Sequence, residues 1–301
     1  MHPPRPLPSG LGASFTVDRA RTAGVTPARL RASDLSAPFH GTRATGEVAG
    51  LARLRLLLAV LPAHAFAMGS TAGAVWQLPL PGPLETRAFA EPMIGVPAPA
   101  NRIRRPGIRG RSVAVDPAVI GTWRGVRIAS PARTWIDLSA ELSPADLVAV
   151  TDRLIHHRAP LCSLEDLRAE AMRHPRQKGA ASRVRSLQLA NDRSESRRES
   201  LLRVLLIEAG LPVPECNVEI WDGARHVARV DMLYREQRLV LEYQGDHHRD
   251  PDQWSRDQMR RAELEALGYT VTYVTRRDFD DPERLAARVR RLLAITARNA
   301  R

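Results

Sequence analysis

Residues 225–243 decide the fold of the C-terminal part of this chain and read Arg225-His-Val-Ala-Arg-Val-Asp-Met-Leu-Tyr-Arg-Glu-Gln-Arg-Leu-Val-Leu-Glu-Tyr243. Two runs rich in β-branched and apolar residues flank a polar segment at 235–237, which is typical of a β-hairpin. A helical pattern precedes the hairpin, and a helix, a strand and a last helix follow it. We therefore predict an α/β domain at residues 196–299, with a mixed sheet flanked by helices.

The register of this hairpin determines whether its polar side chains converge. If the turn is centred on the Arg-Glu pair of the polar segment, Asp231 lies opposite Val240. The two-residue period of a strand then puts Glu242 and Gln244 on the face of Asp231. Because an odd number of loop residues would move them to the opposite face, this convergence is a testable expectation.

Two carboxylates on one face of a buried sheet call for a cation. Asp231 and Glu242 have no apparent ion-pair partner in the sequence, and buried unpaired carboxylates are costly. Mg²⁺ takes oxygen ligands and lowers the pKa of a bound water, so that the water can attack a phosphodiester. Glu199 precedes the hairpin as a third acid, although an acid at a helix N-terminus is also favoured by the helix dipole alone.

Several motifs between residues 196 and 296 occur together in one family. In chain order they are Glu199 with a Leu-rich helix and Gly210-Leu-Pro, Val230-Asp231, Leu241-Glu-Tyr-Gln-Gly-Asp-His-His-Arg249, Arg256-Asp257, and Gly268-Tyr-Thr-Val ahead of Val274-Thr275. With them, the segment resembles the endonuclease-like domain of unknown function 559, which is related to the very-short-patch repair endonucleases of the PD-(D/E)xK superfamily. The resemblance implies a restriction-endonuclease-like fold and metal-dependent hydrolysis of DNA, in DNA repair or phage defence.

The resemblance also implies roles for single residues. Asp231 would be the main ligand of Mg²⁺ or Mn²⁺ and Glu242 the second. Gln244 stands where the superfamily more often has Lys, and a glutamine can orient water but lacks the charge of a lysine. His247 and His248 follow it, and histidines titrate near neutrality, as a general acid or base must. With Glu199, these residues make up the predicted catalytic site.

Arginines near the same sheet edge are the candidate DNA contacts. Arg249, Arg256 and Arg260 lie on or just before a helix predicted at 252–267, where they would reach phosphates. Acids at 250, 257 and 263–265 offer them ion pairs instead, so both interpretations stay open.

The upstream two thirds divide into two predicted parts. Residues 1–45 are rich in Pro, Gly and Ser without periodicity, so we expect them to be largely disordered. Residues 46–190 are predicted to form a smaller α+β domain. Its helices are expected at 51–61, 70–76, 130–138, 143–156, 163–174 and 179–190, and its strands at 85–90, 112–115 and 126–128. A polar linker at 191–197 follows.

Positive charge is concentrated upstream. The chain has a net charge of +12, carried almost wholly by arginine because Lys178 is the only lysine. Residues 1–193 hold 26 basic and 14 acidic side chains, whereas residues 194–301 hold 19 of each. The tract 101–111 alone contains five arginines interleaved with glycine. Since guanidinium groups suit phosphate, we expect the upstream part to supply much of the attraction to DNA, with a solvated basic surface as the alternative.

A second resemblance concerns this upstream part. The phrase Val126-Arg-Ile-Ala-Ser-Pro-Ala-Arg-Thr-Trp-Ile-Asp-Leu138, after a Leu-rich helix, is similar to the AbiEi type IV antitoxin family. The resemblance implies an α/β middle domain and a link to DNA. Arg133 and Asp137 fit best as a structural hydrogen-bonded pair at a helix start. The alternative function is therefore a non-catalytic DNA-binding regulator that retains a nuclease scaffold.

The number of cysteines and the length of the apolar runs indicate the cellular compartment. Cys162 and Cys216 are two lone thiols, which suggests a reducing cytoplasm. The first residues contain no apolar run of signal-peptide length, and the longest apolar stretch, at 56–62, is too short to span a bilayer. We expect a cytoplasmic protein with DNA as its partner and no membrane partner; the sequence does not give the oligomeric state.

Overall fold

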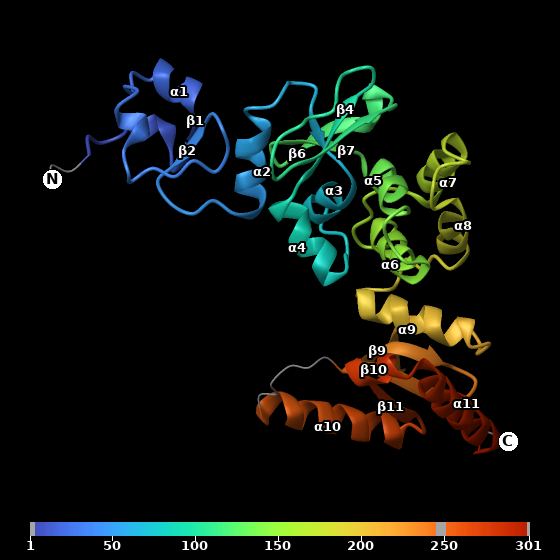
Figure 1. Ribbon diagram of the computed structural model, residues 1–301. Coiled ribbons are helices and arrows are strands. Elements are labelled where there is room, and N and C mark those ends of the chain that lie inside the picture. Colours follow the sequence, from blue (N-terminus) through green and yellow to red (C-terminus); the bar gives the residue numbers. More distant parts are fainter. Residues whose placement is uncertain (1–3, 245–250, 300–301) are drawn as a thin grey trace. The chain divides into compact units, whose positions relative to one another are not determined.

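The structure is a computed structural model that describes residues 4–244 and 251–299 (Figure 1). The fold is mixed α/β, with three sheets among the described residues. The chain divides into two compact units, Met1–Leu138 and Ser139–Arg301, which are described separately below.

The beginning of the first unit is folded, so the expectation of a largely disordered segment at 1–45 is wrong for residues 4–45. Strand β1 (Ser14–Thr16) pairs antiparallel with β2 (Thr42–Ala44). The other elements are η1 (Ser9–Leu11), α1 (Val17–Thr22) and η2 (Arg29–Arg31). Their apolar side chains form a small core of Leu11, Phe15, Ala20, Val25 and Leu30. These residues come from two short 3-10 helices, a strand, an α-helix and a loop, so no single period marks them in the sequence.

The larger sheet of the first unit has five strands in the order β5-β4-β3-β7-β6. The strands are β3 (Phe66–Ala67), β4 (Met93–Pro97), β5 (Arg109–Val113), β6 (Ile120–Trp123) and β7 (Val126–Ala129). The helices of this part are α2 (Gly50–Leu58), α3 (Gly69–Val75), α4 (Gly82–Ala90) and α5 (Pro131–Leu138). The pairs β4–β5 and β3–β7 are parallel, and β3–β4 and β6–β7 are antiparallel.

The strand predicted at 85–90 is wrong, because this stretch belongs to α4. Pro83 lies in the first turn of that helix, where its missing N–H costs nothing. The N–H of Glu85 donates to the carbonyl of Pro81 and closes the turn. The predicted strands at 112–115 and 126–128 overlap β5 and β7, and the helix predicted at 70–76 is α3.

Arg133 and Asp137 form the structural pair that the sequence favours. Both side chains are buried in α5, and Arg133 Nε donates to Asp137 Oδ1 at 3.1 Å. The other oxygen, Oδ2, accepts the backbone N–H of Gly69 at 3.4 Å. The pair therefore ties α5 to the start of α3.

The second unit begins with three helices, α6 (Pro144–Leu154), α7 (Leu164–Arg173) and α8 (Ala180–Gln188). Ser143 caps α6 by accepting the N–H of Asp146, and Ser163 and Asp166 form a reciprocal capping box on α7. The helices predicted between 143 and 190 are thus confirmed to within two residues at each end.

These three helices belong to the C-terminal unit, so the division of the chain differs from the one expected at the linker 191–197. Helix α6 packs against α9 (Arg197–Glu208), and a fully buried ion pair, Asp152 with Arg203 at 2.6 Å, joins them. The polar stretch between the helices bonds to both of them: the N–H of Asn191 donates to Asp152 Oδ1, and Ser194 bonds Ser200. A polar run that looks like a linker in sequence thus contributes the buried Ser194 and the Asn191 backbone to hydrogen bonds with α6 and α9, while most of its other side chains are exposed.

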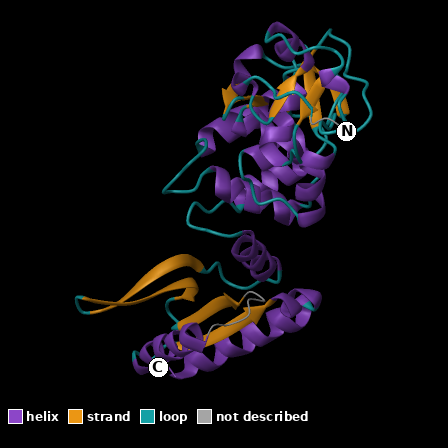
Figure 2. Ribbon diagram, turned by 90° about the vertical axis from the view of Figure 1, so that its left-hand side faces the viewer, coloured by secondary structure: helices purple, strands orange, loops and turns teal. Residues whose placement is uncertain are grey.

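The remaining elements form a four-stranded sheet in the order β11-β10-β9-β8. The strands are β8 (Glu215–Asp222), β9 (Arg225–Tyr234), β10 (Leu239–Gln244) and β11 (Thr270–Thr275). Neighbours are antiparallel except β10 and β11, which are parallel. Figure 2 shows the β8–β9 hairpin extending past the body of this sheet. The other elements of the unit are α10 (Pro251–Ala266), η4 (Arg276–Asp280) and α11 (Pro282–Asn299).

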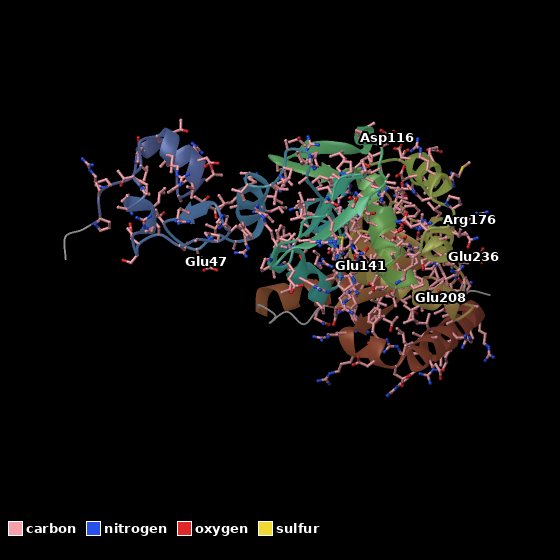
Figure 3. All side chains as sticks on the ribbon, turned by 45° about the horizontal axis from the view of Figure 1, so that its top comes forward. Glu47, Asp116, Glu141, Arg176, Glu208 and Glu236 are labelled. Atoms are coloured by element: carbon pink, nitrogen blue, oxygen red, sulfur yellow. The ribbon has the colours of Figure 1, made fainter. Side chains whose placement is uncertain are left out.

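Helices cover both faces of this sheet (Figure 1). On one face, leucines of α9 and α11 pack with Met232, Leu239 and Leu241. On the other face, Leu264 of α10 packs with Leu233 and Val240. The acids at 231 and 242 alternate with Met232 and Leu241 along their strands, so they lie on the α10 face. Between β9 and β10, Glu236 lies in the loop (Figure 3).

Within residues 4–244 and 251–299, no helix is both long enough and apolar enough to cross a bilayer.

Candidate functional site

The hairpin of β9 and β10 brings Asp231 and Glu242 to one face. Its register pairs Leu233 with Val240 and Met232 with Leu241. The next position along this register sets Asp231 against Glu242, so the expected pairing of Asp231 with Val240 is wrong. The reason is the turn, which is closed by a hydrogen bond from the Arg238 N–H to the Arg235 carbonyl and therefore lies one residue later. Because the position opposite Asp231 changes by two residues, from Val240 to Glu242, the alternation of side chains keeps the shared face.

Asp231 lies where the β9–β10 ladder ends. Its Oδ2 accepts the backbone N–H of Tyr243 at 2.8 Å, so the carboxylate takes the place of a strand carbonyl. Burial raises the pKa of Asp231, and the negative charge of Glu199 raises it further; the Tyr243 bond and the positive charges of Arg260 and Arg229 oppose this rise. The other oxygen, Oδ1, accepts no hydrogen bond from the part of the chain that the structure describes. Asp231 is therefore a half-buried acid with one oxygen available.

Glu242 is buried and ion-paired. It is 6% exposed, and Arg260 of α10 donates to its Oε2 at 2.7 Å. Arg260 also donates to the carbonyl of Arg229 at 3.3 Å. The sequence indicates no ion pair for Glu242, and this expectation is wrong. For Arg260 the sequence leaves a DNA phosphate and an ion pair open; Arg260 forms an ion pair, with Glu242 rather than with the acids at 250, 257 or 263–265. The pair forms because α10 crosses the face on which Glu242 lies.

Glu199 is close enough to act on Asp231 by charge, but its own carboxylate is engaged elsewhere. Its Oε2 accepts hydrogen bonds from Asn217 Nδ2 at 2.6 Å and from the N–H of Glu195 at 3.0 Å. Asn217 has a positive φ of 50° and lies in β8 beside Asp231, between the pairs 216–232 and 218–230. Asn217, which lies beside Asp231, is thus the residue that connects Glu199 to the site.

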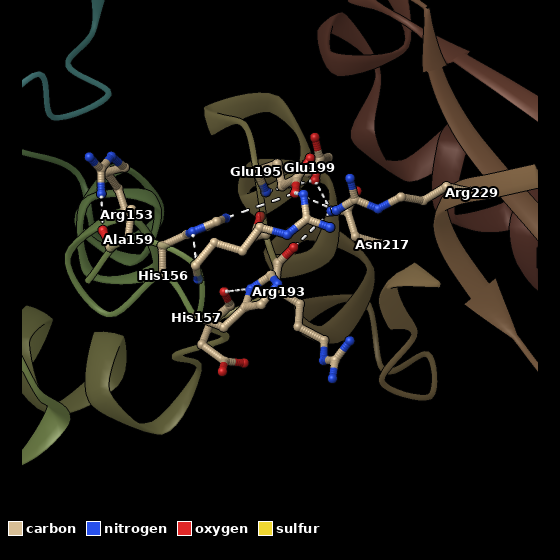
Figure 4. A network of polar contacts seen from close by, with 12 residues as sticks. Arg153, His156, His157, Ala159, Arg193, Glu195, Glu199, Asn217 and Arg229 are labelled. Carbon is tan, nitrogen blue, oxygen red and sulfur yellow. Dashed lines mark hydrogen bonds and ion pairs between the residues drawn. The ribbon is translucent and has the colours of Figure 1, made fainter. Parts of the chain in front are cut away.

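A polar network extends from Glu199 through Glu195 to the helical part of the unit (Figure 4). Glu195 pairs with Arg229, and lies 3.5 Å from Arg158 and 3.9 Å from His156. The hydrogen bond from Arg229 lowers the pKa of Glu195, and burial lowers the pKa of His156. This network was not predicted from the sequence. One signal was present, since Arg229 lies two residues before Asp231 and therefore on the same strand face.

The other predicted site residues are placed as follows. Gln244 ends β10 beside Thr275 of β11, and the strand period puts it on the face of Glu242. Arg256 is exposed on α10. His247, His248 and Arg249 lie outside the described residues.

Among the described residues, two carboxylates of the candidate site, Asp231 and Glu242, could bind a divalent metal ion. In residues 4–244 and 251–299, no group of three or more His, Cys, Asp or Glu side chains is arranged to hold a metal. Mg²⁺ is commonly bound by one or two carboxylates together with waters and substrate phosphates. Asp231 and Glu242 fit that donor set, because they share a face and Asp231 Oδ1 is available. At Glu242 the ion would compete with Arg260 for Oε2.

The two cysteines are not suited to nucleophilic chemistry. Burial raises the pKa of both Cys162 and Cys216 to about 12. At neutral pH both are thiols, and a thiolate is the reactive form.

Two proteins of Mycobacterium tuberculosis are similar to this chain, one from strain CDC 1551 / Oshkosh and one from strain ATCC 25618 / H37Rv. Each is described only as an uncharacterised protein and is 30% identical over 166 residues. The match covers 54% of this chain and 60% of each relative, less than two thirds of their length. No protein-family profile matches the chain, and no solved structure matches it.

Proposed function

We propose that this protein is a metal-dependent endonuclease of the PD-(D/E)xK kind that hydrolyses DNA. One observation carries the proposal: Asp231 and Glu242 lie on one face of the sheet, each one residue beyond the last pair of the β9–β10 ladder, Met232 with Leu241. Burial and the neighbouring Glu199 raise the pKa of Asp231, and such perturbed acids gather at catalytic sites.

Each described residue has a definite task under this proposal. Asp231 and Glu242 hold the ion, which when bound polarises the phosphodiester and lowers the pKa of a water. Gln244, on the same face, orients that water through its amide. Arg260 exchanges Glu242 for a phosphate oxygen, an equally good acceptor for its guanidinium.

A second function is favoured by a specific contact. The Arg260–Glu242 pair already neutralises the second carboxylate without a metal, and Gln244 supplies no positive charge. Both features suit a DNA-binding regulator that keeps the scaffold without catalysis. This alternative predicts DNA binding that is independent of divalent ions.

Nicking of supercoiled plasmid in Mg²⁺ or Mn²⁺ separates the two functions. We expect the wild type to nick DNA and Asp231→Ala to lose at least about a hundredfold in rate, the usual scale for losing a main electrostatic contributor. The matched control is Asp222→Ala, because Asp222 is an exposed acid on the neighbouring strand. Nicking that survives Asp231→Ala would refute the site. Binding by both proteins with nicking by neither would favour the regulator.

A further inference from the structure

A cavity of about 690 Å³ lies at the end of β11, between η4 and the first half of α11. Four arginines and two aspartates line it: Arg277, Arg284, Arg288, Arg291, Asp278 and Asp281. We propose that this cavity, called here the arginine cavity, binds the phosphodiester backbone of DNA beside the candidate site. The inference rests on the proposed function, since it names how the same site would hold its substrate.

The arginine cavity is a local excess of positive charge. It holds four basic and two acidic side chains, whereas residues 194–301 as a whole are balanced. Arg284, Arg288 and Arg291 follow each other at four- and three-residue spacing on α11, which puts them on one face of the helix. Arg277 reaches the same space from η4.

The two aspartates of the arginine cavity form hydrogen bonds and an ion pair with other residues that line it or lie next to it. Asp278 Oδ2 accepts the N–H and hydroxyl of Thr275 at 2.7 and 2.9 Å, and its Oδ1 pairs with Arg288 at 3.0 Å. Asp281 Oδ1 accepts the backbone N–H of Arg284 at 3.0 Å. These bonds fix the loop before any ligand arrives, which reduces the entropic cost of binding.

Three guanidinium groups are left for a ligand. Arg277, Arg284 and Arg291 are exposed, and none of them makes an ion pair with another residue that the structure describes. Arg284 and Arg291 are seven residues apart on the helix, a rise of about 10 Å. That spread suits successive phosphates of a chain better than a single small anion. Guanidinium forks bind phosphate oxygens in pairs, without reading the base.

The position of the arginine cavity links it to the candidate site. Strands β10 and β11 are parallel, so their carboxyl ends lie at the same sheet edge, with Gln244 beside Thr275. The ring of Tyr243, which follows Glu242 in β10 and points to the opposite, α11 face of the sheet, packs edge-on against Phe279 of η4 with centroids 6.0 Å apart. In open α/β sheets this edge is where ligands bind. DNA that runs over this edge would contact the arginines on the α11 side of the sheet and the carboxylates on the α10 side.

The test is equilibrium binding of a fluorescent 20-base-pair DNA duplex to the full chain at several salt concentrations, with Ca²⁺ replacing Mg²⁺. We expect the double variant Arg284→Glu/Arg291→Glu to bind at least about tenfold more weakly at physiological salt. The slope of log K against log salt should fall by about 0.9 for each phosphate that the variant no longer neutralises. The loss should be the same for AT-rich and GC-rich duplexes, since the DNA backbone carries no sequence information.

The matched control is Arg298→Glu, which reverses one charge on an exposed residue of the same helix outside the cavity. Arg298→Glu should leave the affinity for DNA within twofold of the wild type, whereas the single variant Arg291→Glu should weaken binding by more than that. Equal losses in these two variants would overturn the inference, because they would reflect overall charge alone. Arg291→Gln, a milder change, repeats the comparison if the glutamate variant does not fold.

Failure of this inference is distinct from failure of the proposed function. If the wild type nicks plasmid and Arg284→Glu/Arg291→Glu binds DNA normally, the arginine cavity is refuted and the nuclease stands. If no variant nicks DNA but the double variant loses binding, the arginine cavity stands and the nuclease is refuted.

Discussion

The second unit holds two arginine–carboxylate pairs of nearly equal length in very different surroundings. Arg203 and Asp152 are 2.6 Å apart with side chains 2% and 1% exposed. Arg260 and Glu242 are 2.7 Å apart, but the arginine is 35% exposed while the glutamate is 7% exposed. The first pair is closed to solvent at both ends, and the second only at the carboxylate.

This difference in exposure distinguishes a structural ion pair from one whose arginine can be replaced by another cation. Asp152 also accepts hydrogen bonds from Ser200 Oγ and the Asn191 N–H, so its carboxylate is fully engaged and its cation cannot be exchanged. Arg260 can turn into solvent and leave Glu242 to another cation. Two pairs that look alike by distance alone therefore have different expected roles, one in holding helices together and one in a replaceable contact.

The largest expected effect comes from breaking the fully buried pair of Arg203 and Asp152. Arg203→Ala leaves Asp152 charged and buried without its partner, so we expect a loss of about 3–5 kcal/mol in unfolding free energy. Urea denaturation measures it. Arg185→Ala is the matched control, because Arg185 forms a half-exposed pair with Glu208 at 3.8 Å and should cost at most about 1 kcal/mol. Equal losses in the two variants would contradict the comparison.

Breaking the half-exposed pair of Arg260 and Glu242 should lower the unfolding free energy by less, and it should make Glu242 available to a metal ion. Because Arg260 is one third exposed, Arg260→Ala should lose about 1–2 kcal/mol, between the values for exposed and buried pairs. We also expect Mn²⁺ to raise its thermal midpoint more than that of the wild type, since Glu242 no longer has a competing cation. Adding Asp231→Ala should abolish that gain. An unchanged response to Mn²⁺ would mean that Arg260 does not occupy the metal position.

Asp231 gives a pH-dependent effect of smaller size. Burial raises its pKa in the folded protein, so the folded state holds the proton more tightly than the unfolded chain. The ionised form therefore costs stability, a cost that is absent below the ordinary Asp pKa of about 3.9 and complete above the raised pKa. Asp231→Asn should gain stability relative to the wild type as pH rises through that window. Denaturation at acidic and neutral pH checks this, and Asp222→Asn should show no such gain.

The smallest effect is expected at Glu195, in the half-exposed network around Arg229. The hydrogen bond from Arg229 lowers the pKa of Glu195, so its contribution is present above the ordinary Glu pKa of about 4.3 and is lost as pH falls through the lowered value. Glu195→Gln should cost at most about 1 kcal/mol at neutral pH, measured by urea denaturation. A loss that persists in strong acid would show that the charge is not the cause.

The sequence predicted the part of the site that depends on local periods. Side-chain alternation in β9 and β10 was sufficient to put Asp231, Glu242 and Gln244 on one face, even though the turn was misplaced by one residue. The Arg260–Glu242 pair was not predictable, because it depends on which face α10 crosses. Glu199 was recognised as an acid near the site, but its bond to Asn217 needs the positive φ of that residue, which no local pattern indicates.

The same distinction holds for the fold. Helices with strong caps, such as those started by Ser143 and Ser163, were predicted correctly because their signals are local. The N-terminal core around Phe15 was missed because its residues come from short elements of different kinds and so share no period. The strand predicted at 85–90 failed because alternation in a short segment resembles part of a helical pattern.

The hydrogen bonds that Asn191 and Ser194 make to α6 and α9 have a consequence for how the chain can be divided. A fragment beginning at residue 196 would lack Asp152 and Val148 of α6, the partners of Arg203 and Val204, so the face of α9 that they cover would be exposed to solvent. We expect such a fragment to be insoluble when expressed alone, whereas one beginning at Ser139 retains both partners. In domain exchange between proteins, the workable junction lies between Leu138 and Ser139, about sixty residues before the place that composition suggests.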